Sequence, residues 1–385
     1  MKKALATILA LVMALGLTTA AWADDAGETC NGENCTHAAE FNGKHYNHLV
    51  DAYAALTRGT TKPAAAEVIT LLRDSSGGGI GSDADTNMNY VIDFGGHTYT
   101  VGAPAVGSTG TVSQGLRVLK TSTAKFTNGT LKAADYNGLV QVVHTYGDVT
   151  FENFNVDARE NSYAQIAVEP DCGTLNITGN SSILAREGMT GLYVAFWHTA
   201  TYDGTTVNVN TTGKITGKLV YEFDEDMTGN DVATENKAVL NIANGNFEIT
   251  GIQTLFSGVA NEALKEAKIE VSGGTFSTDV KEYLAEGKIL QKNGDTYTAV
   301  TNSGITSGTY TSEPTVPSGY KATKNDDGTW TVSKVSYYYY QPTTDTKTTD
   351  TKGSPKTFDA GIALYVGMAL TSAAGVAFVG KKRED

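Results

Sequence analysis

The sequence predicts an all-β protein whose strands coil into a right-handed parallel β-helix, a solenoid, with a short helix capping its N-terminal end. Three observations predict this fold. One strand-and-turn motif recurs through the middle of the chain, and a second set of apolar strands recurs at similar intervals. The composition combines 42 glycines with only 7 prolines. Short apolar runs joined by glycine-containing turns are typical of many-stranded proteins.

The recurring motif consists of a strand with alternating apolar residues, a small polar turn and a further apolar residue. Its six copies are FTNGTL from Phe126, FENFNV from Phe151, ITGNSSI from Ile177, VNTTGKI from Val209, IANGNF from Ile242 and VSGGTF from Val271. Successive copies begin 25, 26, 32, 33 and 29 residues apart, a period typical of solenoids. We therefore expect each strand to pair in register with its equivalent one turn further along.

A companion apolar strand precedes each copy. These strands are LRVLK, LVQVV, AQIAV, LYVAF, LVYEF and IQTLF, beginning at Leu116, Leu139, Ala164, Leu192, Leu219 and Ile252. Two strand families in step indicate a coil wound about one axis, and strand alternation predicts which side chains fill it. The side chains predicted to point inward are Leu175 and Ile177, Val207 and Val209, Leu240 and Ile242, and Ile269 and Val271.

The open ends of a solenoid expose an apolar core and an unpaired strand edge, so we expect each end to be covered. Leu49, Ala52, Tyr53 and Leu56 recur at helical spacing and predict an amphipathic helix over the first coil. AEVITLL and NYVIDFGGHTYTV then predict strands of that coil. At the far end, DVKEYLAEGKIL predicts a short helical segment, and DTYTAV and GTWTVSK predict closing hairpins.

The N-terminal end predicts export from the cytoplasm. Lys2 and Lys3 precede an apolar run, Ala4 to Leu17, and Ala21 and Ala23 offer small side chains at the expected cleavage site of a signal peptide.

The C-terminal end predicts a transmembrane helix. Residues 361–380 carry no charged side chain and are about as many as a helix needs to cross a bilayer. Lys381, Lys382 and Arg383 follow at once, and basic residues beside a span stay on the cytoplasmic side. We therefore expect the bulk of the chain outside the cell, joined to the plasma membrane by this helix.

A motif stands just before this apolar span, made of Ser354, Pro355, Lys356, Thr357 and Phe358. The motif, the span and the basic tail in this order resemble the LPxTG-like sorting signal of Gram-positive cell-wall proteins. The resemblance implies that a sortase cleaves after Thr357 and joins it to peptidoglycan. Phe358 departs from the family, which has glycine there, and leaves open whether the anchor is covalent or transmembrane.

The middle of the chain also resembles a family. VIDFGGHTYTV, FTNGTL and SGGTFSTDVKEYLAEG, with the HYNHLVDAYAAL helix, are similar to pectate-lyase-like β-helix ectodomains of Gram-positive surface proteins. The expected organisation is a signal peptide at 1–23, an N-terminal cap at 24–88, a parallel β-helix at 89–300, a C-terminal β cap at 301–335, a linker with the sorting-like motif at 336–357, and the transmembrane helix with its basic tail at 358–385.

The formal net charge of −13 excludes classes of partner that need a basic surface. Neither nucleic acid nor an anionic membrane surface is expected to bind the ectodomain. Nothing in the sequence requires an oligomer, so we expect a monomer.

The three cysteines leave their chemistry open. In an oxidising compartment Cys30 and Cys35 are expected to form a disulfide, with Cys172 left over. Free thiols are one alternative. A metal site with the neighbouring histidines is another, but the spacing fits no recognised zinc pattern, so no metal or cofactor is predicted.

No catalytic set stands out in the sequence. Asp224, Glu225 and Asp226 are consecutive, which favours a solvated loop, and Asp157 and Arg159 belong to a polar turn. Walker, GxSxG and HExxH motifs are absent.

Aromatic side chains supply the candidate binding residues. Tyr193, Trp197 and Tyr202 lie close together in the sequence and are candidates for stacking on sugars, unless they only cover a junction between coils. The sequence thus predicts a non-enzymatic surface protein, an adhesin or display scaffold that binds glycans or a host surface. A polysaccharide lyase or glycoside hydrolase on the same scaffold is the alternative.

Overall fold

The computed structural model describes residues 35–108, 110–199, 202–225 and 233–336. The chain divides into two compact units, and the first ends at Val335. The expected signal peptide with Ala21 and Ala23, the sorting-like motif from Ser354 to Phe358 and the apolar span lie outside the described residues. Within those residues, no helix is both long and apolar enough to cross a membrane.

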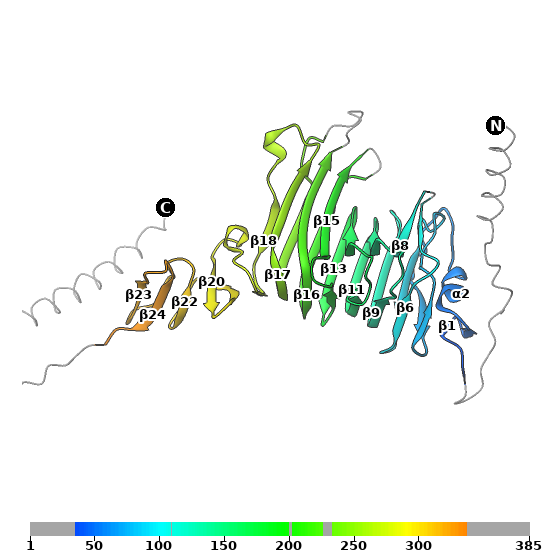
Figure 1. Ribbon diagram of the computed structural model, residues 1–385, viewed down its shortest axis with the longest axis horizontal. Helices are drawn as coiled ribbons and strands as arrows, with labels where there is room; N and C mark the ends of the chain where they lie inside the picture. The colour runs from blue at the N-terminus through cyan, green and yellow to red at the C-terminus, as the bar shows by residue number, and fades with distance from the viewer. Residues whose placement is uncertain (1–34, 109, 200–201, 226–232, 337–385) are drawn as a thin grey trace, which may run out of the picture. The chain divides into compact units, whose positions relative to one another are not determined.

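The described chain is a parallel β-helix of about seven turns, right-handed in type and nearly without helix (Figure 1). Three stacks of parallel strands form its walls. The first stack runs through β3 (Glu67–Leu71), β5 (Asn89–Asp93), the start of β9 (Thr123–Ala133), the start of β11 (Asp148–Asp157), β13 (Gly173–Gly179), the start of β16 (Thr205–Glu225), the start of β17 (Ala238–Ser257) and β18 (Lys268–Val271).

The second and third stacks continue the same coils. The second runs through β4 (Ser75–Gly77), β6 (Thr98–Val101), the ends of β9 and β11, β14 (Ser182–Leu184), the middle of β16 and β17, and β19 (Thr275–Phe276). The third runs through β8 (Thr111–Val118), β10 (Gln141–Thr145), β12 (Ile166–Pro170), β15 (Thr190–His198) and the ends of β16 and β17.

The strand register confirms the predicted repeat. In the first stack Phe126, Phe151, Ile177, Val209, Ile242 and Val271 pair in succession, which is the alignment of the six copies. All of the side chains predicted to point inward are buried except Ile269, which is half-buried and packs against the core. Each fully buried side chain of this size contributes roughly 1.5–3 kcal/mol to folding.

The companion strands required one correction. Their equivalent residues are Leu116, Val143, Val168, Leu192, Leu219 and Ile252. The predicted alignment began two of these strands at Leu139 and Ala164, four residues too early. Both of those residues are also fully buried, so the alternation of apolar residues could not distinguish the two registers.

The predicted amphipathic helix is present at the N-terminal end of the coils. Helix α2 (Leu49–Ala54) buries Leu49, Ala52 and Tyr53, and Leu56 is buried just beyond it. A hairpin of β1 (Ala39–Phe41) and β2 (Lys44–Tyr46) precedes the helix, and β1 pairs antiparallel with β3 of the first coil. Helix and hairpin together cover the N-terminal end of the core.

The remaining strands are antiparallel. β7 (Val106–Ser108) pairs with β8 beside the third stack. At the C-terminal end lie β20 (Lys288–Asn293), β21 (Thr296–Thr301), β22 (Gly308–Tyr310), β23 (Tyr320–Lys324) and β24 (Trp330–Lys334), with two short 3-10 turns before them, η1 (Glu262–Leu264) and η2 (Lys281–Tyr283). β21, predicted from DTYTAV, pairs with β19 of the last coil and covers that edge, whereas β24, predicted from GTWTVSK, pairs with β22 and β23.

Candidate functional site

Polar side chains gather on the outer face of the third stack. Leu116, Val143 and Val168 are paired residues that point into the core, so the residue after each of them points outward. Those outward residues are Arg117, His144 and Glu169, which pair with one another across three successive coils. All three are 8% exposed or less, although they lie outside the core.

His144 is held between two hydrogen-bonding partners. Its Nε2 lies 2.6 Å from an Oδ2 of Asp171, and its Nδ1 lies 2.9 Å from Nε2 of Gln114. An amide nitrogen donates, so in this arrangement Nδ1 accepts and Nε2–H donates to the carboxylate. Gln114, Arg117, His144, Glu169 and Asp171 are named the polar cluster below.

The surroundings within the polar cluster raise the pKa values of two of its members, His144 and Glu169. Burial alone lowers the pKa of His144, but the hydrogen bond and charge of Asp171, with the charge of Glu169, outweigh it and leave that pKa above its usual value. Burial, and then repulsion by Asp171, raise the pKa of Glu169 to about 7. A carboxyl group whose pKa is near neutral pH, like that of Glu169, is uncommon.

Several buried polar atoms at this place have no hydrogen-bond partner within the described part of the chain. They are Oε1 of Gln114, Nε of Arg117, Oε2 of Glu169 and Oδ1 of Asp224. Native proteins satisfy most such atoms, so a group of them at one place suggests a ligand or ordered water. If His144 is protonated, its Nδ1 also donates, and a rotated Gln114 amide would then present Oε1 to it.

A row of aromatic rings leads from the polar cluster to the surface. The Tyr146 ring lies 4.5 Å from the His144 ring, and the Tyr202 ring lies 4.9 Å from Tyr146. Trp197 stacks on Tyr202 with 6.1 Å between centroids and 26° between planes, and it is 46% exposed. We call Tyr146, Tyr202 and Trp197 the aromatic row.

Cationic groups flank the aromatic row. The Arg117 guanidinium lies 5.9 Å from the centroid of Tyr146, and Nζ of Lys120 lies 6.0 Å from that of Tyr202. Arg117 also bonds Asp83 at 2.6 Å and the Ser108 hydroxyl at 2.7 Å, which connects the cluster to the turn at Asp83 and to the end of β7.

The structure brings together two of the three predicted aromatic residues. Trp197 and Tyr202 stack, whereas Tyr193, half-buried on β15, has no ring contact among the described residues with either of them. Their neighbour Phe196 points inward and stacks on Phe223 at 5.0 Å. The sequence analysis did not predict the polar cluster or Tyr146. The pattern that indicates the cluster is an outward Arg, His and Glu at equivalent positions of three coils. It was not recognised because two companion strands were predicted to begin four residues too early.

Asp224 and Glu225 were predicted to lie in a solvated loop, and this prediction was wrong. Asp224 and Glu225 end strand β16 and, as alternation requires, lie on opposite faces. Glu225 is buried and accepts a hydrogen bond from the backbone N–H of Ala233 at 2.7 Å. Burial, and then the charge of Glu222, raise the pKa of Asp224 on the outer face, while Asp226 lies outside the described residues.

The polar turn at Asp157 is occupied by ion pairs. Arg159 bonds both oxygens of Asp157, at 2.9 and 2.7 Å, and Glu160 pairs with Lys132 at 2.7 Å. Arg159 and Glu160 are exposed, and charged groups that are paired in this way are ordinary surface structure.

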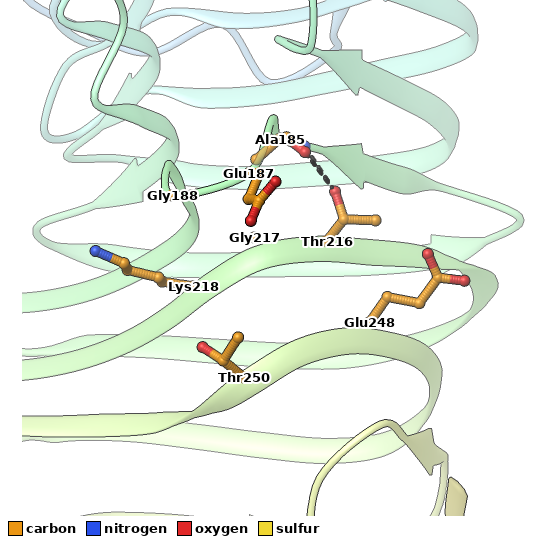
Figure 2. A pocket seen from close by; sticks show the side chains of 8 residues that line it. All are labelled: Ala185, Glu187, Gly188, Thr216, Gly217, Lys218, Glu248 and Thr250. Carbon is orange, nitrogen blue, oxygen red and sulfur yellow. Dashed lines mark hydrogen bonds between the residues drawn. The ribbon is translucent and has the colours of Figure 1, made fainter. Parts of the chain in front are cut away.

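A pocket of about 430 Å³ lies elsewhere on the coils, where the turn after β14 meets β16 and β17 (Figure 2). Its lining residues are Ala185, Glu187, Gly188, Thr216, Gly217, Lys218, Glu248 and Thr250. The lining holds no aromatic ring, its charged side chains are exposed, and Thr216 is hydrogen-bonded to the backbone of Ala185. The polar cluster with its aromatic row is the better candidate site.

Comparison with known proteins found no matching family, no similar characterised protein and no similar solved structure.

Proposed function

We propose that this chain is an exported surface protein of a Gram-positive bacterium that binds carbohydrate on the outer face of its third strand stack, without catalysis. The observation that carries the proposal is the aromatic row, with an exposed Trp197 at one end and buried charged groups at the other. The C–H faces of sugar rings stack on aromatic rings, and sugar hydroxyls need convergent acceptors and donors. The ammonium group of the exposed Lys120, beside the Tyr202 ring, is a donor of that kind.

The location outside the cell rests on the two ends of the sequence. A signal peptide ending near Ala23, a C-terminal apolar span and the LPxTG-like motif around Thr357 would place a pectate-lyase-like ectodomain at the cell wall or plasma membrane. There the β-helix would act as an adhesin or display scaffold, monomeric and attached either through the membrane helix or by a sortase to peptidoglycan.

Burial favours binding over catalysis. A catalytic acid or base must touch the reacting atoms, and His144, Glu169 and Asp171 are only 5%, 8% and 8% exposed. Tyr146 lies against His144 on the way to the surface. Trp197, by contrast, can be contacted without any rearrangement.

One observation supports a second candidate, a polysaccharide lyase or glycoside hydrolase. A carboxyl group with a pKa of about 7, such as that of Glu169, suits general acid–base catalysis near neutral pH. This candidate requires the aromatic cover to move when substrate binds.

The first test is binding of residues 24–335, the first compact unit without the predicted signal peptide, to a panel of plant, mucin and microbial polysaccharides. We expect Trp197→Ala to weaken binding of the best glycan at least about tenfold, the loss typical of a central aromatic contact. Tyr163→Ala is the matched control, because Tyr163 is 52% exposed but lies outside the aromatic row. Thermal unfolding should show both variants folded.

Each other outcome has a clear meaning. Equal binding by Trp197→Ala and the parent chain, or no binding to any glycan, would contradict the proposal. Release of new reducing or unsaturated ends would instead support the enzymatic candidate, and Glu169→Gln should then abolish that release.

A further inference from the structure

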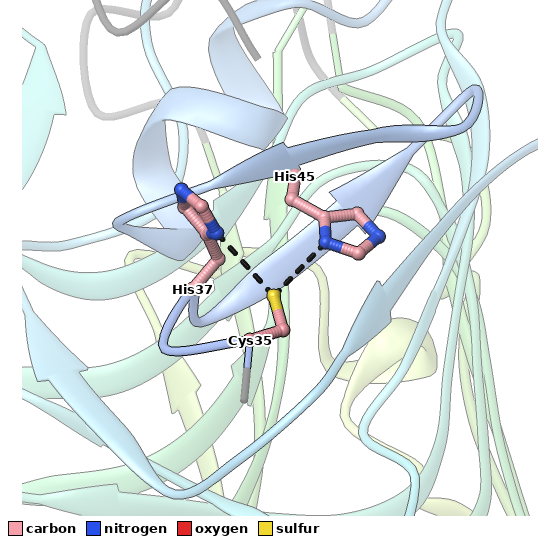
Figure 3. Close-up of side chains that lie close together, drawn as sticks. All are labelled: Cys35, His37 and His45. Carbon is pink, nitrogen blue, oxygen red and sulfur yellow. Dashed lines mark hydrogen bonds between the residues drawn. The ribbon is translucent and has the colours of Figure 1, made fainter. Parts of the chain in front are cut away.

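A second group of metal-ligand side chains lies in the N-terminal cap, outside the carbohydrate site. The Cys35 sulfur lies 3.3 Å from Nδ1 of His37 and 3.0 Å from Nδ1 of His45, and the two rings approach it from two sides (Figure 3). All three residues are half-buried, and their ligand atoms lie within 4.8 Å of one another.

The β1–β2 hairpin produces this juxtaposition. Asn42 and Gly43 at its turn have φ values of 53° and 73°, the paired positive angles of a tight hairpin turn. The backbone N–H of Ala38 donates to the carbonyl of Tyr46 at 2.8 Å, which carries the antiparallel pairing one residue beyond β1. The chain from Cys35 to His37 is thereby held beside His45 on β2.

The donor set suits a divalent transition metal. A thiolate with two imidazoles is typical of Zn²⁺, with bonds of about 2.3 Å to sulfur and 2.0–2.1 Å to nitrogen. In a tetrahedral site these lengths place sulfur and nitrogen about 3.5 Å apart. The observed separations of 3.0 and 3.3 Å need to widen by only a few tenths of an ångström.

An outer carboxylate completes the arrangement. Oε2 of Glu40 lies 3.9 Å from Nε2 of His45, the ring nitrogen that faces away from the sulfur. At 3.9 Å the carboxylate is too far for a hydrogen bond, but a small movement of the Glu40 side chain would give the contact by which carboxylates orient metal-bound histidines. Glu40 and His45 are paired across the hairpin, so the register of β1 and β2 fixes this contact.

We propose that Cys35, His37 and His45 bind a divalent transition-metal ion, Zn²⁺ or one of similar ligand preference. The three protein ligands leave a fourth position for water or an external ligand. Because the ion would join the segment before β1 to β2, its binding energy would stabilise the cap over the first coil. The site is independent of carbohydrate binding.

The metal site and the predicted disulfide exclude each other. A sulfur bonded to Cys30 cannot serve as a thiolate ligand. Cys30 lies outside the described residues, so the disulfide remains a prediction. Counting thiols therefore tests the proposal directly.

The experiment uses residues 24–335, purified without reductant, stripped with a chelator and titrated with ZnCl₂ against a chromophoric competitor. We expect one ion per chain and a rise in melting temperature when Zn²⁺ is added. With Co²⁺ as the probe, a sulfur-to-metal charge-transfer band should report thiolate ligation. Three reactive thiols are expected in the denatured chain.

Matched variants locate the ion. Cys35→Ser and His45→Ala should each weaken binding at least about 100-fold, beyond the usual cost of losing an outer-shell group. Cys172→Ser and His97→Ala should bind as the parent chain does. A single reactive thiol, or Zn²⁺ binding that survives Cys35→Ser but is lost in His144→Ala, would overturn the proposal, the latter by placing the ion in the polar cluster.

Discussion

Replacing Asp85 by alanine is expected to lower the free energy of unfolding by about 3–5 kcal/mol, because the buried Tyr53 hydroxyl loses its acceptor and the half-buried Arg58 loses its ion pair. Asp85 is 2% exposed and bonds Nε of Arg58 at 2.8 Å. It also accepts the Tyr53 hydroxyl at 2.8 Å and the backbone N–H of Ser82 at 2.6 Å. Without it, helix α2 loses its polar connection to the first coil.

The measurement is urea unfolding followed by circular dichroism. Asp326→Ala is the surface control, because Asp326 lies in the exposed turn between β23 and β24, and its effect should stay within about 0.5 kcal/mol. If Asp85→Ala cost no more than this control, the cap would not depend on the buried carboxylate, and the importance we assign to it would be wrong.

Glu169→Gln is expected to stabilise the protein at pH 8 and to leave its stability unchanged at pH 4. The pKa of Glu169 is about 7 in the folded chain, raised mainly by burial from an ordinary value of 4.5. Below pH 4.5 the group is protonated in the folded and unfolded states alike. As the pH rises from 4.5 through 7 the unfolded state loses the proton first, so stability falls, by about 3 kcal/mol in all.

Glutamine keeps the shape of the side chain and removes this loss, so the gain should grow across that pH interval and then level off. Urea unfolding at several pH values measures it. Glu152→Gln is the control, because Glu152 is exposed and pairs with Lys125 at 2.6 Å on the surface, where an ion pair contributes little. A Glu169→Gln variant less stable than the parent chain at pH 8 would show that the charged carboxylate supports the fold.

The candidate site was predicted only in part, and the reason lies in register. Trp197 and Tyr202 are near in sequence, so their proximity could be inferred. His144 and Asp171 are 27 residues apart and meet only because one lies a full turn beyond the other. A shift of one residue in either coil would turn one of these side chains to the opposite face.

The metal-ligand group was considered in the sequence as an alternative but was not predicted, for a related reason. Cys35 and His37 are close in the sequence, but His45 joins them through the turn at Asn42 and Gly43. The sequence spacing matched no known zinc pattern, whereas the folded hairpin brings the sulfur and both nitrogens to within a few tenths of an ångström of the separations expected around zinc. Spacing along a chain reports ligand geometry only where the local backbone is already known.

The sequence by itself determined the repeat, the inward residues of the first stack and the helix that caps the first coil. These features depend on local periodicity, because burial of one strand face or one helix face leaves a pattern of period 2 or 3.6. Tertiary structure alone decided the register of the companion strands at Val143 and Val168, the polar cluster and the approach of Cys35 to His45. Those contacts join residues from different turns or strands, and turn length, which the apolar pattern does not encode, sets which residues meet.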